Sequence, residues 1–127
     1  MAPRTRILNP VAADKLMNNK GVTLQWIGWD HRGTARVTDD NGVWRLSAAQ
    51  AQPDGPGKLQ LDGTIREIGG DYFVFDGTIS ITDTPDKGRA CRKQAQWRFA
   101  VTQNRPYWRA RHFAWCDGLT DYVDIYF

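Results

Sequence analysis

Glutamate is almost absent from this sequence: of its 14 acidic residues, 13 are aspartate and one is Glu67. Lysine is also scarce, with five residues against twelve arginines. Both residue types favour helices, so their scarcity, together with 12 glycines and six tryptophans, excludes helix bundles and coiled coils and favours a β-rich chain. Long apolar runs are missing too, because residues 1–20 hold none longer than Val11-Ala12-Ala13. As it stands, the sequence predicts a cytoplasmic protein without a membrane partner, or a periplasmic or secreted one if a leader was removed.

The recognisable motifs of enzymes are also missing. The sequence has no glycine-rich nucleotide-binding motif, P-loop, His-Glu-X-X-His or Gly-X-Ser-X-Gly, and its single glutamate excludes a glycosidase with paired glutamates. It has two histidines and two cysteines without a Cys-X-X-Cys, so we expect no metal site, cofactor or redox catalysis. The acidic stretches 39–42 and 83–86 lack the ligand spacing of a calcium loop and are expected to be turns.

The chain has 127 residues and a mass of 14.5 kDa, which predicts a single domain. Asn9-Pro10 is typical of a helix start and Gly21 of a stop, so residues 1–21 are expected to form an arm and a short helix over residues 10–18. The net charge of +3 would assist binding to an acidic partner but is far below that of a dedicated nucleic-acid arm.

From residue 22 to residue 127 the apolar residues follow the period of two that is typical of strands. The expected strands are 22–29, 33–39, 43–48, 57–68, 72–82, 91–102, 106–116 and 121–127. The tripeptide Gly42-Val43-Trp44 resembles the Gly-X-Trp of lipocalin-like barrels. It lies on the third expected strand rather than the first, so it assigns no family.

Four turns predict the strand pairing, because each must place apolar residues on one face. They pair Trp26 with Val37 across Asp30–Gly33, Val37 with Leu46 across Asn41-Gly42, Ile65 with Phe75 across a three-residue loop at Gly69–Asp71, and Phe99 with Trp108 across Gln103-Asn104. A two-residue loop in the third hairpin would set Ile65 against Val74 and mix the faces. The shared face, with Gly28, Gly63 and Gly77 on it, predicts an antiparallel up-and-down β-barrel of about eight strands, closed or nearly closed, with the helix at an end or a side. A curved sheet around the helix and a two-layer sandwich are the alternatives.

The inner face of this barrel is expected to be aromatic. It carries Trp26, Trp44, Phe73, Phe75, Trp97, Phe99 and Trp108. Eight strands enclose a space that side chains can fill or that can hold one small ligand, and seven aromatic rings favour filling. The alternative is an aromatic pocket in which Trp26, Trp97 and Trp108 contact a ligand and His112, expected beside Ala95 and Ala110, is the polar anchor.

The outer face alternates arginine with aromatic residues. Its candidate interaction residues are Trp29, Arg98, Arg109, Arg111 and Trp115. Such a surface suits a protein interface, including that of a homodimer, and less well a single nucleic-acid strand. The alternative is a solvated face in which the arginines pair with Asp62, Asp76 and Asp124 and the helix covers the apolar part.

The fourth hairpin also places Cys91 opposite Cys116. Antiparallel neighbours lie about 4.5–5.5 Å apart, which a disulfide can span, although the missing leader favours reduced thiols. The sequence therefore predicts a non-catalytic barrel protein that binds a small apolar or aromatic ligand. The alternatives are an interaction module that uses the outer face and an enzyme built around His112.

Overall fold

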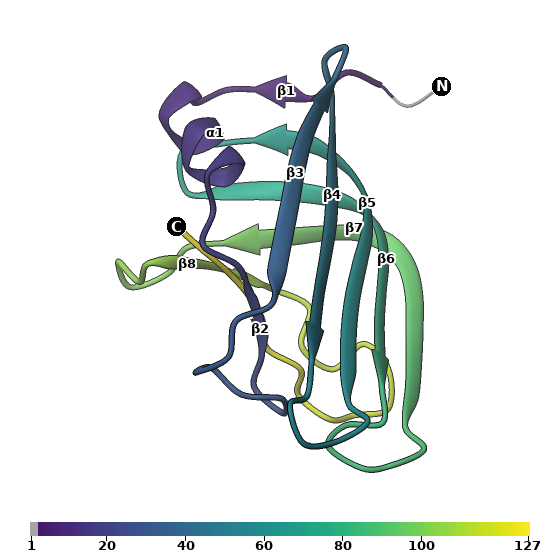
Figure 1. Cartoon of the computed structure of the whole chain (residues 1–127). Helices are drawn as coiled ribbons and strands as arrows, with labels where there is room; N and C mark the ends of the chain where they lie inside the picture. The colour runs from purple at the N-terminus through teal and green to yellow at the C-terminus, as the bar shows by residue number, and fades with distance from the viewer. Residues whose placement is uncertain (1–2) are drawn as a thin grey trace.

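One largely antiparallel sheet organises the chain in the computed structural model, which describes residues 3–127 (Figure 1). The elements are β1 (Arg6–Ile7), α1 (Pro10–Met17), β2 (Val22–Leu24), β3 (Thr34–Asp40), β4 (Val43–Ala51), β5 (Lys58–Ile68), β6 (Tyr72–Thr82), β7 (Ala90–Ala100), β8 (Tyr107–Ala110) and β9 (Val123–Tyr126). No helical segment of residues 3–127 combines the length and the apolar character needed to cross a membrane.

The strands follow one another around a nearly closed barrel. Their order is β2-β9-β8-β7-β6-β5-β4-β3, so β3 to β9 form a meander and β9 then pairs with β2 from the other end of the chain. A single bridge between Val22 and Gly33 brings β2 beside β3. The predicted all-β, antiparallel barrel is therefore confirmed.

The predicted strand 22–29 is wrong beyond Leu24, and so is the pairing of Trp26 with Val37. Strand β2 ends at Leu24 and pairs with β9, where Val22 lies opposite Ile125. Residues 25–33 form a loop that leads to β3. This partner comes from the far end of the chain, so a local pattern of alternation could not reveal it.

The two hairpins in the middle of the chain have the predicted pairing. Asn41 and Gly42 both have positive φ, 53° and 90°, as a tight hairpin turn requires, and Val37 lies opposite Leu46. The confirmed pairs of the next hairpin are Leu59–Ile81, Leu61–Ile79, Gly63–Gly77 and Ile65–Phe75. These two hairpins supply much of the buried face.

The turn between β5 and β6 differs from the prediction. The Gly69 N–H donates to the Tyr72 carbonyl at 2.8 Å, so the loop has two residues rather than three. Glu67 consequently pairs with Val74, and a β-bulge at Arg66 restores the predicted register further along the strand. The additional residue in β5 explains why a two-residue turn does not mix the two faces.

The hairpin between β7 and β8 is shifted by two residues. Gln103 and Asn104 form the predicted turn, with φ of 56° and 55°, but Phe99 lies opposite Ala110 instead of Trp108. Pro106 follows the turn and has no N–H to donate, so the regular ladder resumes only at β8. β8 also ends at Ala110, and the predicted strand 106–116 is wrong from residue 111 onward.

A buried glutamine closes the gap between β2 and the β3–β4 hairpin. Gln50 on β4 is 2% exposed, and its Oε1 accepts from the Leu24 N–H at 2.7 Å. Its Nε2 donates to the carbonyls of Gly28 and His31 at 2.8 and 2.9 Å. One side chain thus replaces ladder hydrogen bonds where the sheet is incomplete.

Helix α1 lies across one end of the barrel, near the C-terminus (Figure 1). The predicted start is confirmed, because the Asn9 side chain accepts from the Ala12 N–H at 2.9 Å and Pro10 is the first helical residue. Ala12, Ala13 and Leu16 are buried in the core. This burial stabilises a helix of eight residues, which is too short to persist alone.

Candidate functional site

The barrel interior is packed with aromatic side chains. Trp97 and Trp108 are each 1% exposed, and the Trp97 indole donates to the Gly77 carbonyl at 2.9 Å. Phe73 stacks on Phe99 with ring centroids 4.8 Å apart. Phe75 is also fully buried, and its ring meets that of Phe99 edge-on with centroids 6.3 Å apart. Side chains therefore occupy the space in which the sequence placed a candidate ligand.

The predicted position of His112 on the inner face is wrong. His112 is exposed, and its ring meets the edge of Trp97 at 5.7 Å between centroids. The alternation that placed it inside stops where β8 ends, at Ala110. The structure therefore does not bring His112 together with Trp26 and Trp108 around a cavity. Trp26 itself is half-buried and packs against the core.

A continuous row of arginine and aromatic side chains covers the outside of β8, β9 and the chain between them. We call it the Arg–aromatic ladder, and its members in spatial order are Arg32, Tyr126, Tyr107, Arg109, Tyr122, Phe113 and Arg111. Each guanidinium carbon lies 4.0 to 5.1 Å from the centroid of a neighbouring ring. Stacking of this kind holds flat groups in fixed positions at a surface.

A buried ion pair anchors the middle of the ladder. Arg109 donates from Nε and Nη2 to the two oxygens of Asp124, at 2.7 and 2.9 Å. The Asp124 side chain is 1% exposed, and burial raises its pKa although Arg109 opposes that shift. Hydrogen bonding to Asp124 raises the pKa of Arg109. The predicted pairing of an outer arginine with Asp124 is confirmed. The ion pair holds the Arg109 guanidinium beside the rings of Tyr107 and Tyr122.

Trp29 forms the rim of a pocket beside this ladder. The pocket has a volume of about 280 Å³ and is lined by Trp29, Tyr107, Arg109, Asp124 and Tyr126; we call it the Trp29 pocket. Trp29 is 52% exposed although it is a large aromatic residue. Two elements distant in sequence, the loop 25–33 and the β8–β9 pair, therefore meet at one aromatic concavity.

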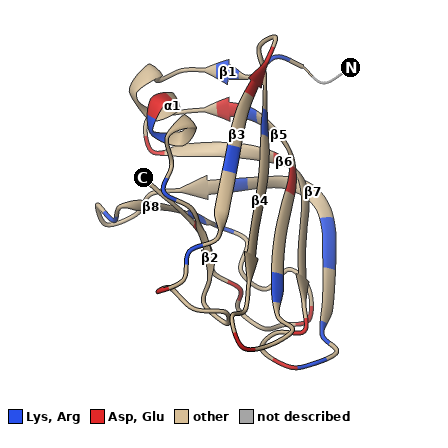
Figure 2. Cartoon of the chain, in the orientation of Figure 1, with Lys and Arg blue, Asp and Glu red and all other residues tan. Residues whose placement is uncertain are grey.

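The other predicted surface residues lie apart from this pocket. Arg98 is exposed on β7, with its guanidinium carbon 4.1 Å from the Tyr72 ring centroid. Arg111 is exposed at the end of the ladder. Trp115 does not stand on the outer face as predicted: it is half-buried and packs edge-on against Trp97 at 5.2 Å. Acidic and basic residues are otherwise found on several strands and turns of the face shown in Figure 2.

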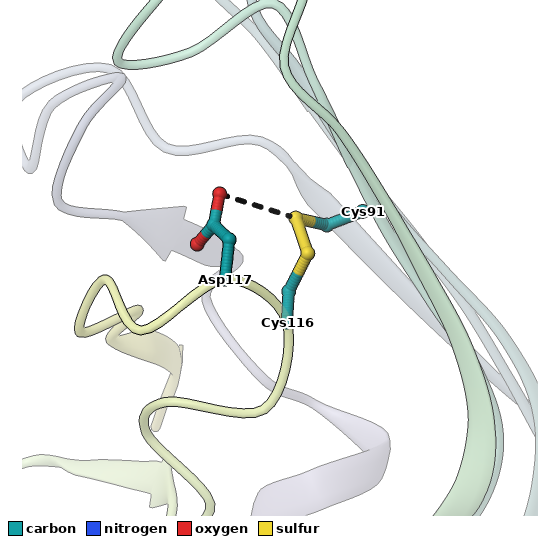
Figure 3. A group of neighbouring side chains, drawn as sticks. All are labelled: Cys91, Cys116 and Asp117. Carbon is teal, nitrogen blue, oxygen red and sulfur yellow. Dashed lines mark hydrogen bonds between the residues drawn. A yellow bond between two sulfur atoms is a disulfide. The ribbon is translucent and has the colours of Figure 1, made fainter.

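Cys91 and Cys116 form a disulfide, with their Cα atoms 5.8 Å apart. The prediction that they are neighbours is confirmed, although Cys116 lies in the loop after β8 and not on a strand. Asp117 Oδ2 lies 3.9 Å from Cys91 Sγ (Figure 3). These three residues are close enough to share an ion, but each sulfur is bonded to the other and offers no thiolate.

Sequence analysis did not predict the partly buried charge network at the same end of the barrel. Arg89, whose side chain is 5% exposed, pairs with Asp117 and Asp121 at 2.8 Å each. Asp121 is fully buried and also accepts from the Trp26 indole at 2.9 Å. Arg89 was not among the residues singled out from the sequence, because its partners follow it by about 30 residues. The network and the disulfide together fix the loop that carries Phe113 and leads to Tyr122.

The fold and these contacts define a small antiparallel β-barrel protein with a filled interior and an aromatic concavity on its outside. Residues 4–127 match the PM1083 family, and the chain belongs to it. A relative from Pasteurella multocida (strain Pm70), the uncharacterized protein PM1083, is 34% identical over 116 residues, which are 90% of this chain and 74% of the relative. No solved structure matches the chain.

Proposed function

We propose that this protein is a non-catalytic binding protein that holds an aromatic or apolar group of a small ligand in the Trp29 pocket. The observation that carries the proposal is the concavity between Trp29 and the rings of Tyr107 and Tyr126. Ligand sites are typically concave and largely apolar, with a few polar groups that fix orientation. In this pocket Arg109 and Asp124 are the polar groups.

The packing around the pocket supports a preformed site. Arg109 is held by Asp124 and stacks on Tyr107 and Tyr122, so the floor and one wall are ordered without a ligand. Trp29, by contrast, leaves about half of its surface in water. A planar group inserted beside it would remove apolar surface from water at little cost in ordering the remaining walls.

A protein partner is a second candidate. The Arg–aromatic ladder continues beyond the Trp29 pocket to Phe113 and Arg111, further than a ligand that fills about 280 Å³ would reach. Arginine and aromatic residues are enriched in the centres of protein interfaces. A second copy of the chain would be one such partner.

The test uses 1-anilinonaphthalene-8-sulfonate as a fluorescent probe and unlabelled indole as its competitor. Trp29→Ala should weaken probe binding about tenfold or more, because a buried aromatic contact contributes about 1.5–3 kcal/mol. Val11→Ser is the matched control, because Val11 is 66% exposed and lines a different apolar pocket of about 350 Å³ beside Phe127. Probe binding that is lost in Val11→Ser and retained in Trp29→Ala would refute the proposal. Sedimentation of the wild type and of Arg111→Ala tests the second candidate, which predicts a dimer that this substitution weakens.

A further inference from the structure

The N-terminal arm places two arginines beside the outer face of β5. β1 runs parallel to β5, with Arg6 opposite Glu67. Thr5 ties the arm to the neighbouring hairpin, because its N–H donates to the Gly42 carbonyl at 2.8 Å and its Oγ1 accepts from the Trp44 N–H at 2.9 Å. The side chains of Arg4 and Arg6 on either side of Thr5 therefore extend from a fixed backbone.

The bulge in β5 adds a third arginine at the same level. Ile65 and Ile68 are both fully buried, so the two residues between them, Arg66 and Glu67, both face outward. In a regular strand one of these two residues would point into the barrel. Bulges frequently re-aim side chains in this way beside functional sites.

These elements enclose a pocket of about 280 Å³. It is lined by Pro3, Arg4, Arg6, Arg66, Glu67, Val74 and Gln96, and we call it the arginine pocket. Three arginines and one glutamate are thus among its lining residues. Figure 2 shows the basic segments on β1 and in the chain that leads into it.

The internal ion pairs occupy only part of the donor capacity of these arginines. Arg6 lies 3.5 Å from Glu67 and its side chain is 72% exposed, so this pair is weak. Arg66 uses Nη1 to reach Asp76 at 3.1 Å. Each guanidinium has five N–H donors in a planar fork, so these two ion pairs use only part of the donors of Arg6 and Arg66.

We propose that the arginine pocket binds the phosphate or carboxylate group of a small anionic molecule. Guanidinium forks match the paired oxygens of these groups and bind them with charge-assisted hydrogen bonds. Val74 supplies an apolar contact for the carbon part of such a molecule and Gln96 a further amide donor. The site is independent of the Trp29 pocket, since the two pockets share no lining residue.

The experiment is a calorimetric titration of the full chain with inorganic pyrophosphate and, separately, with citrate. The variants are Arg66→Gln and Arg4→Gln, and the control is Arg36→Gln, which removes the same charge from an exposed position on β3. Each pocket variant should weaken binding about tenfold, because a hydrogen bond to a charged group is worth about one decade in affinity or more. Arg36→Gln should leave the affinity within about twofold, since one distant surface charge is largely screened.

The two anions distinguish the source of the oxyanion. Tighter binding of pyrophosphate assigns the pocket to phosphate compounds, and tighter binding of citrate assigns it to carboxylates. Undetectable binding of both anions to the wild type would overturn the proposal, and so would an equal loss of affinity in all three variants. Arg4→Gln keeps the test valid if Arg66→Gln unfolds, because the arm residue Arg4 lies outside every helix and strand.

Discussion

Gln50 provides a direct test of how this barrel is closed. Its side chain makes three hydrogen bonds across the gap between β2 and β4: one accepted from Leu24 and two donated to Gly28 and His31. Gln50→Ala removes all three and leaves the Leu24 N–H, on a fully buried residue, without its partner. The half-exposed loop that carries the two carbonyls can recover hydrogen bonds from water.

The expected loss follows from these partners. A buried donor without an acceptor costs about 1–3 kcal/mol, and each of the two other hydrogen bonds contributes about 0.5–1 kcal/mol after exchange with water. Gln50→Ala should therefore lower the free energy of unfolding by about 3 kcal/mol. At a denaturant dependence of about 2 kcal/mol per molar urea, the unfolding midpoint should fall by about 1.5 M.

The assay is urea unfolding followed by tryptophan fluorescence and by circular dichroism. Gln60→Ala is the matched control, because Gln60 is exposed on β5 and its truncation should change stability by less than about 0.5 kcal/mol. If Gln50→Ala shifted the midpoint no more than Gln60→Ala, the claim that this side chain closes the barrel would be wrong.

Two further predictions concern the loop after β8. Replacing Cys91 and Cys116 by alanine should lower the free energy of unfolding by about 3.5 kcal/mol on the chain-entropy model, given their separation of 25 residues; urea unfolding measures it, and a loss below about 1 kcal/mol would contradict it. Hydrogen bonds from Arg89 lower the pKa of Asp117 from the usual 3.8 to about 2. Because the folded pKa lies below the unfolded one, Asp117 stabilises the fold above about pH 4 and loses that effect as the pH falls toward 2. Asp117→Asn should therefore reduce the loss of stability between about pH 4 and pH 2. An NMR titration of Asp117 with a midpoint at or above 3.8 would refute the lowered pKa.

Turns and alternation predicted the centre of the fold because both are local. The positive φ that Asn41-Gly42 adopts is a property of those two residues, and it sets the register of β3 against β4. The bulge at Arg66 could not be derived in this way. Its effect on the register is equivalent to one more residue in the adjacent loop, so alternation alone favoured a three-residue loop and a strand without a bulge.

The candidate site was predicted only in part, because its formation also depends on contacts between residues distant in the sequence. Alternation placed Trp29 and Arg109 outside, where the structure has them. It could not indicate that Arg109 would be stacked between Tyr107 and Tyr122, because that arrangement depends on the loop after β8 returning as β9. His112 was misplaced since the alternation continues in the sequence after the strand has ended.

The measurement that tests the central claim most directly is an NMR titration of the ¹⁵N-labelled protein with unlabelled indole, observing the indole N–H signals of the tryptophans. A ligand in the Trp29 pocket should shift the indole N–H signal of Trp29, which is 52% exposed. The signals of Trp97 and Trp108, each 1% exposed, should not change. Shifts of Trp97 or Trp108 with an unchanged Trp29 signal would place the ligand inside the barrel and contradict the account.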